Sequence, residues 1–224
     1  MEPVLFDFGR LPPEELEAGH AIWRNLMELQ HAAENFRLAV DLFMLVRELR
    51  PLPSADDMPD WSDEGQLRRR QQNSWMRIAG RSGAIDANGC RALMTAIKKA
   101  KAPTVWASAA MAEREAGWAL FAAEFPNILG IRNAAAHPGE LSKDAKEMRE
   151  HMKEGPFVIG AMTAEENSSV FISGSMQIIP GGMVYRSTFK GEIVEYELSY
   201  RKANVLDQVT RHYIETFRPF LLRG

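Results

Sequence analysis

The sequence lacks most features that mark secreted, membrane or metal-binding proteins. It contains one cysteine, Cys90, which excludes an intrachain disulfide framework and a cysteine-based zinc cluster. No stretch approaches the roughly 18 uncharged apolar residues of a membrane span. Residues Met1–Val4 do not open a basic segment followed by an apolar run, as a secretory signal would. We therefore expect a cytoplasmic protein that has no membrane partner.

Several catalytic motifs are also missing. The segment Gly80–Gly83 lacks the lysine and the spacing of a phosphate-binding Walker loop. Neither a Gly-x-Ser-x-Gly elbow nor a pair of catalytic carboxylates stands out. Four histidines have no carboxylate or cysteine partner at metal-ligand spacing in the sequence: His20, His31, His151 and His212. We expect neither a metal site nor a cofactor.

What the sequence does contain is an ordinary globular composition with segregated charge. Its 224 residues are 46% hydrophobic and 25% charged, enough for one sizeable domain with or without an appended element. The net charge of −3 divides into −9 over residues 1–66, +8 over 67–101 and −2 over 102–224. Either the basic segment is a phosphate-binding surface, or it packs along the acidic helix before it and the two charges compensate.

A long helix is predicted over residues 12–50. Pro12 and Pro13 precede an acidic first turn, and Pro51 ends the pattern. The apolar residues between them recur in steps of four and three, as a single buried stripe requires. The members of this stripe are Ile22, Leu26, Leu29, Ala33, Phe36, Val40 and Phe43.

Further helices follow a proline- and aspartate-rich loop at residues 51–63. They are predicted over residues 64–99, 110–125 and 141–153. Because glycine is a poor helix former, three glycines are expected to interrupt the basic helix: Gly80, Gly83 and Gly89. The bulky core residues of the helix over 110–125 are expected to be Trp118, Phe121 and Phe125.

The pattern changes to strands after Gly155-Pro156. Strands are predicted at 157–162, 169–179, 183–189 and 193–200, with turns at 180–182 and 189–192. A helix over 203–222 closes the chain. The predicted fold class is therefore α+β: a helical bundle over 1–153, then a small antiparallel β-meander and a C-terminal helix over 154–224, packed on the bundle as one unit.

The motif with chemical potential is Arg132-Asn133-Ala-Ala-Ala-His137. It combines a permanently cationic guanidinium with an imidazole that titrates near neutral pH. On an uninterrupted helix, side chains five residues apart point about 140° apart. Arg132 and His137 therefore converge only if the helix breaks near Pro138, which disfavours helical geometry at His137, or if a second subunit takes part.

This motif resembles the Arg-x(4–6)-His motif of the HEPN superfamily, whose ribonuclease members often carry a polar residue after the arginine, as Asn133 does here. HEPN domains are helical bundles, and the resemblance covers residues 14–153. Arg24 and His31 also fit the pattern, but they lie in the middle of the first predicted helix. The HEPN motif comes late in the bundle, which favours Arg132 and His137.

The resemblance implies a HEPN-like homodimer in which two copies of the motif meet in one cleft. It further implies a metal-independent endoribonuclease or an RNA-binding factor of a defence or stress system, with an antitoxin or another protein as partner. On this hypothesis His137 transfers the proton and Arg132 stabilises the extra negative charge of the transition state. Asn133 would hold the imidazole or a phosphate oxygen.

The basic segment supplies candidate RNA-binding residues. Arginines would follow the RNA backbone and Trp75 would stack on a base: Arg68, Arg69, Arg70, Arg77 and, further along, Arg81. Alternatively, Trp75 and Ile78 belong to the core and the arginines form a solvated face.

Two other functions stay open. The first is a non-catalytic dimeric interaction protein, in which Arg132 pairs with Glu124 or Glu140 and His137 caps a helix. The second is a small-molecule sensor with its pocket between bundle and sheet, although no residue pattern specifies its ligand.

Overall fold

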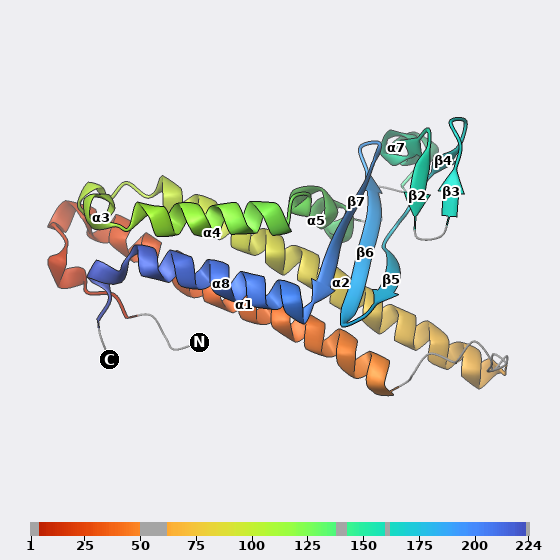
Figure 1. Ribbon diagram of the computed structural model, residues 1–224, viewed down its shortest axis with the longest axis horizontal. Helices are drawn as coiled ribbons and strands as arrows, with labels where there is room; N and C mark the ends of the chain where they lie inside the picture. The colour runs from red at the N-terminus through yellow and green to blue at the C-terminus, as the bar shows by residue number, and fades with distance from the viewer. Residues whose placement is uncertain (1–4, 50–61, 138–142, 160–161, 223–224) are drawn as a thin grey trace. The chain divides into compact units, whose positions relative to one another are not determined.

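The computed structural model describes residues 5–49, 62–137, 143–159 and 162–222, and it has the predicted α+β fold (Figure 1). Helices form most of the chain, and short antiparallel strands and a C-terminal helix follow them. Within the described ranges the α-helices are α1 (Leu16–Leu49), α2 (Asp63–Lys99), α3 (Pro103–Ser108), α4 (Met111–Glu124), α5 (Ile128–Ala136), α7 (Ala145–His151) and α8 (Tyr200–Thr216).

The strands form three small antiparallel sheets. A three-stranded meander has the order β5-β6-β7, with β6 in the centre, and each of the other two sheets is a single strand pair. The pairs are β1 with β4 and β2 with β3. The strands are β1 (Lys153–Glu154), β2 (Phe157–Ile159), β3 (Met162–Ala164), β4 (Ser169–Val170), β5 (Ser175–Ile179), β6 (Gly182–Phe189) and β7 (Glu192–Ser199).

The meander confirms the sequence prediction, while two predicted strands differ in detail. The segment 157–162 is not one strand, because β2 and β3 fold back on each other as a short hairpin. The segment 169–179 is divided into β4 and β5. Both predicted turns are confirmed, and Gly181 and Gly191 there have positive φ values of 76° and 75°, which glycine adopts without strain.

The chain forms two compact units that combine segments distant in the sequence. Unit 1 comprises Met1–Phe36, Asp86–Pro126 and Arg201–Gly224, and unit 2 comprises Arg37–Ile85 and Asn127–Tyr200. Both boundaries in the first half of the chain therefore fall inside α1 and α2. The predicted division after residue 153 stays a prediction.

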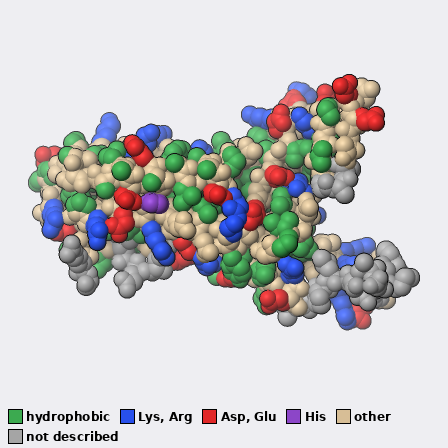
Figure 2. All heavy atoms as spheres, viewed as in Figure 1, with side chains coloured by type: hydrophobic (Ala, Val, Ile, Leu, Met, Phe, Trp, Pro, Cys, Tyr) green, Lys and Arg blue, Asp and Glu red, His purple; other side chains and the backbone are tan. Residues whose placement is uncertain are grey.

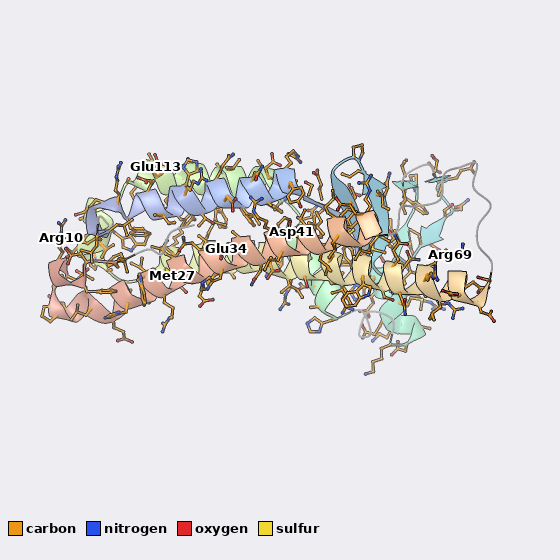
Figure 3. All side chains as sticks on the ribbon, turned by 90° about the horizontal axis from the view of Figure 1, so that it is seen from below. Arg10, Met27, Glu34, Asp41, Arg69 and Glu113 are labelled. Carbon is orange, nitrogen blue, oxygen red and sulfur yellow. The ribbon has the colours of Figure 1, made fainter. Side chains whose placement is uncertain are left out.

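The apolar stripe predicted for the first helix is confirmed. All seven of its residues are fully buried in α1. The acidic residues Glu34 and Asp41 lie off that stripe (Figure 3). Because a spacing of four and three residues returns to one helix face, the local pattern was sufficient to identify this part of the core.

In unit 1 a lysine joins α8 to the C-terminal end of α4. Lys202 of α8 donates to the Glu124 carboxylate at 2.7 Å and also to the Glu124 carbonyl. Arg201 pairs with the same carboxylate at 2.9 Å, and the Lys202 ammonium lies 5.1 Å from the centre of the Phe125 ring. The hydrogen bond from Lys202 lowers the pKa of Glu124. Over α8 and α4, acidic and basic side chains are interspersed (Figure 2).

Unit 2 is organised by a close approach of α2 to the meander. The Tyr196 hydroxyl of β7 donates to the Gly80 carbonyl. A Cβ at position 80 would overlap the Tyr185 ring and would lie 3.0 Å from the Met183 Cε atom. The predicted break of the basic helix at its glycines is therefore wrong: α2 is continuous, and Gly80 is the residue that lets it contact the sheet.

No described helix is both long enough and apolar enough to cross a membrane.

Gly80→Ala is expected to destabilise the protein by about 1–3 kcal/mol, because the added methyl group overpacks the contact with Tyr185. Gly89→Ala is the matched control on the same helix, since its Cβ would meet only the Ala32 Cβ at 3.9 Å. Alanine there should stabilise the helix by up to about 1 kcal/mol. Urea unfolding of both variants measures the difference. Equal stabilities would contradict the close contact at Gly80.

Asp86 gives a prediction for the pH dependence of stability. Burial raises its pKa to about 6, so the folded protein binds a proton more tightly here than the unfolded chain does. The charged carboxylate then costs stability above pH 6, and this cost disappears as the pH falls toward 3.8, the ordinary value. Asp86→Asn should exceed the wild type in stability at pH 7.5 but not at pH 4. Glu28→Gln, at an exposed site of α1, serves as the control in the same unfolding series.

Candidate functional site

The predicted motif lies at the C-terminal end of α5. Ile128, Ile131, Ala134 and Ala135 are the buried face of this short helix, and α5 packs against β6 and β7. Arg132 and Asn133 are half-buried, between the buried face and solvent. The alanines thus serve the packing of the helix, and the polar members of the motif remain at its surface.

Arg132 contacts the side chain next to it. Its Nη1 atom donates a hydrogen bond to the Asn133 Oδ1 atom at 3.1 Å. The Asn133 carbonyl in turn accepts from the His137 backbone N–H at 3.2 Å. The side-chain oxygen of Asn133 therefore orients the Arg132 guanidinium, and its backbone oxygen binds the His137 N–H. Glu124, the alternative partner suggested for Arg132, binds Lys202 and Arg201, and Glu140 lies outside the described residues.

His137 is the first residue after the helix. It is exposed, and its φ and ψ of −125° and 46° are not helical. The break predicted from Pro138 is therefore confirmed, since α5 ends at Ala136. His137 occupies the C-cap position, which agrees with the capping role that the sequence left open. An exposed imidazole at a helix end is also accessible to a substrate.

Arg81 joins the basic helix to the motif. Its Nε atom donates to the Ala135 carbonyl at 2.8 Å, one of the last carbonyls of α5. Such carbonyls lack a partner within the helix and attract a cation at the negative end of the helix dipole. The basic segment and the motif thus meet at this bond, between residues 54 positions apart in the sequence.

Three arginines form a row along α2. At 100° per residue, Arg70, Arg77 and Arg81 lie within about 40° of one another around the helix. Arg70 and Arg77 are exposed, and Arg81 is half-buried. Burial raises the pKa of Tyr185 in β6, and the positive charges of Arg81 and Arg77 oppose that rise. The row, named here the arginine row, therefore runs along α2 toward the end of α5.

The remaining candidate RNA-binding residues do not join the arginine row. Trp75 and Arg68 lie roughly 140–160° away from Arg70 around α2, and Arg69 is half-buried on a third side (Figure 3). Trp75 is 51% exposed and Ile78 47% exposed, so the alternative that placed both in the core is wrong. The buried residues nearby are Met76 and Ala79.

An apolar line on α2 was missed by the sequence reasoning. Leu67, Ile78 and Ile85 are about half exposed and lie within about 20° of one another around the helix. On α1, Leu38 and Leu45 are exposed and seven residues apart, which places them on one helix face. The steps of 11 and 7 along α2 would have revealed the line, but apolar residues at helical spacing are ordinarily assigned to the core.

The scattered histidines have partners that sequence spacing could not reveal. His212 Nδ1 lies 2.7 Å from the Glu113 carboxylate, 99 residues away. His151 Nδ1 accepts from the Lys190 backbone N–H at 3.0 Å, and its ring stacks on Phe189. Among the residues that the structure places, no three His, Cys, Asp or Glu side chains gather as a metal site would require.

Cys90 is buried, as predicted, and burial raises the pKa of its thiol.

Comparisons with protein-family models, with curated proteins and with solved structures gave no match for this chain. The resemblance to the HEPN superfamily therefore depends on the motif and its helical setting alone, and it stays a prediction.

Arg81→Met is expected to destabilise the protein by about 1–2 kcal/mol, because the Ala135 carbonyl loses a charged hydrogen-bond donor. Arg77→Met removes an exposed guanidinium from the same row and should change stability by less than about 0.5 kcal/mol. Urea unfolding compares the two variants. Equal effects would show that the bond to Ala135 does not stabilise unit 2.

Proposed function

We propose that this protein binds single-stranded RNA along the arginine row of α2 and cleaves it without a metal ion at the end of α5. The observation that carries the proposal is the Arg81 bond to the Ala135 carbonyl. That bond joins a row of cations to α5, which bears Arg132 and Asn133 and ends just before His137. Guanidinium groups pair well with phosphate oxygens, so the row would lead an RNA backbone toward His137.

The proposed reaction uses only groups of the RNA and of this chain. The 2′-oxygen of a ribose attacks the adjacent phosphorus, and the bond from phosphorus to the 5′-oxygen breaks. The proton of the 2′-hydroxyl passes to a base, and the departing 5′-oxygen takes up a proton. The products are a 2′,3′-cyclic phosphate and a 5′-hydroxyl. His137, exposed at the helix end, serves as the proton-transfer group.

Arg132 and Asn133 would stabilise the transition state. The phosphorane-like species carries more negative charge than the phosphodiester, and a positioned guanidinium lowers its energy. Asn133 holds the Arg132 guanidinium by the 3.1 Å hydrogen bond and so limits the freedom that substrate binding would otherwise remove. A homodimer, which the HEPN resemblance implies, would bring a second Arg132 and His137 to the same RNA.

A second candidate function is favoured by the apolar line on α2. Exposed apolar residues on one helix face are typical of protein contacts, and Leu67, Ile78 and Ile85 share such a face, between the arginine row and Arg68. On this alternative the protein is a non-catalytic dimer, or it binds another protein, such as an antitoxin, through α2. His137 would then transfer no proton.

The experiment incubates the purified protein with a fluorescent single-stranded RNA in EDTA. His137→Ala should slow cleavage by about 10²–10⁴-fold and Arg132→Ala by about 10²–10³-fold. His31→Ala, from the second copy of the pattern and also exposed, is the matched control and should cleave like the wild type. Cleavage only with added metal, or cleavage equal in His137→Ala and His31→Ala, would overturn the mechanism.

RNA binding is measured on the same proteins over a range of salt concentrations. Arg70→Gln and Arg77→Gln should each reduce the slope of log K against log salt by about 0.7, the contribution of one single-stranded phosphate contact. Arg24→Gln, exposed on α1, should leave the slope unchanged. If the wild type neither binds nor cleaves RNA, and Ile78→Lys abolishes self-association in light scattering, the second candidate replaces the first.

A further inference from the structure

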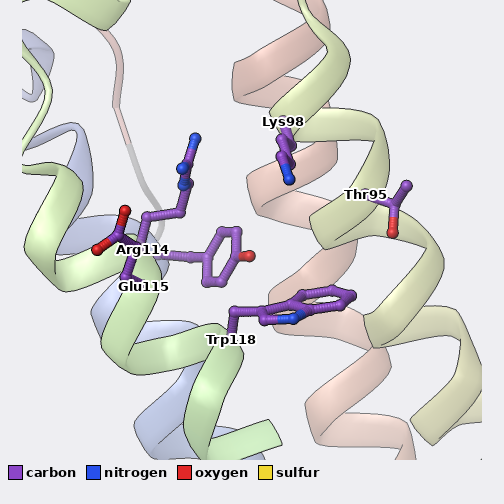
Figure 4. A pocket seen from close by; sticks show the side chains of 6 residues that line it. Thr95, Lys98, Arg114, Glu115 and Trp118 are labelled. Atoms are coloured by element: carbon purple, nitrogen blue, oxygen red, sulfur yellow. The ribbon is translucent and has the colours of Figure 1, made fainter. Parts of the chain in front are cut away.

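A cavity in unit 1 has no role in the proposed reaction. It lies between α2 and α4, has a volume of about 420 Å³ and is lined by six side chains: Thr95, Lys98, Arg114, Glu115, Trp118 and Tyr213 (Figure 4). All six belong to unit 1. Pockets that hold small ligands measure roughly 300–1,000 Å³, so this cavity has room for a molecule as large as a mononucleotide.

Trp118 supplies a flat apolar face. The sequence predicted it in the core, and that prediction is wrong, because the side chain is 42% exposed. Figure 4 shows its indole extending from α4 across the cavity toward α2. Phe121 supports it from the same helix, with ring centres 6.5 Å apart. An indole held in this way offers a stacking surface to a planar ring.

Two cations line the cavity from facing helices. Lys98 is exposed on α2, and Arg114 is half-buried on α4, with its guanidinium 5.5 Å from the centre of the Trp106 ring. Among the described lining residues Glu115 carries the one carboxylate, and Figure 4 shows it pointing away from Lys98 and Trp118. The charge presented to a ligand beside Trp118 is therefore positive.

Tyr213 adds a hydroxyl group to the wall of the cavity. Its side chain is only 1% exposed, and in the part of the chain that the structure describes its hydroxyl has no hydrogen-bond partner. Burial raises its pKa to about 12, against the opposing charge of Arg114, so the hydroxyl keeps its proton. A hydroxyl at the wall of the cavity is available to donate to a ligand there.

The geometry points to a binding site for a small planar aromatic anion, with the ring stacked on Trp118 and its carboxylate or phosphate between Lys98 and Arg114. The Tyr213 hydroxyl donates to the ligand. The site is separate from the proposed RNA site, since every lining residue that the structure describes belongs to unit 1. A nucleoside monophosphate and an aromatic carboxylate share the required chemistry, and the probes below distinguish them.

Isothermal titration of the full chain tests the site with two aromatic anions, adenosine 5′-monophosphate and 2-aminobenzoate. Adenosine, aniline and inorganic phosphate are the matched probes that lack either the charge or the ring. At least one anion is expected to bind with a Kd below 1 mM and at least tenfold more tightly than its neutral counterpart and than phosphate. Absence of binding by both anions, or equal binding of anion and neutral probe, overturns the proposal.

Variants then assign the contacts. Lys98→Gln and Arg114→Gln should each weaken binding by about tenfold, as expected for the loss of one charged hydrogen bond. Tyr213→Phe should weaken it severalfold and keep the ring. Lys101→Gln, at an exposed lysine outside the lining, is the control and should bind like the wild type. Equal affinities of Lys98→Gln and Lys101→Gln would place the probe elsewhere.

His137→Ala separates this site from the proposed ribonuclease. It should lose RNA cleavage and retain full affinity for the aromatic anion. Thermal unfolding of each variant without probe accompanies the titrations, so that a loss of affinity is distinguished from a loss of fold. Since Lys98 is exposed, Lys98→Gln is expected to unfold at the wild-type temperature, and the proposal can be tested on that variant alone.

Discussion

The close approach of α2 to the meander at Gly80 is the contact on which unit 2 depends. At this position the helix backbone itself packs against the Tyr185 ring, because a Cβ there would overlap the ring. The Gly80 carbonyl also accepts a hydrogen bond from the Tyr196 hydroxyl. One residue after Gly80, Arg81 reaches the end of α5. The register of α2 on the sheet therefore determines whether the basic helix and the Arg132–His137 helix meet.

The basic segment turns out to have several distinct sides rather than one positive surface. The arginine row follows one edge of the exposed face of α2, an apolar line occupies its middle, and Trp75 with Arg68 lies at the other edge. A row of cations beside a line of exposed leucine and isoleucine fits both an RNA backbone and an acidic protein partner. The two proposed functions differ in which side of α2 they use, and for that reason substitutions of Arg77 and Ile78 distinguish them.

The cavity in unit 1 is lined by a different set of side chains from the proposed RNA site. Lys98, one of its two cations, is less than five turns of α2 beyond Arg81, yet it belongs to the other unit. The proposed RNA site uses guanidinium groups on an exposed face, whereas the cavity combines an indole, a phenol and two cations around one hollow. A long helix that contributes to both units can thus carry two independent binding sites.

The sequence by itself was sufficient to predict those features that depend on local interactions. The buried stripe of α1, the turns at Gly181 and Gly191, and the end of α5 before Pro138 each follow from helix periodicity or from the φ preferences of one residue. The α+β class could be predicted in the same way from the order of these patterns.

Only the tertiary structure decided the continuity of α2, the exposure of Trp75 and Trp118, and the bond from Arg81 to Ala135. A glycine inside a helix lowers its stability by about 1 kcal/mol relative to alanine. Packing of α2 on the sheet outweighs this local preference, so the helix continues through its glycines. Whether a tryptophan on an amphipathic helix is buried depends on which face another element covers. A bond across 54 residues exists only after both helices have packed on the meander, and no local pattern encodes it.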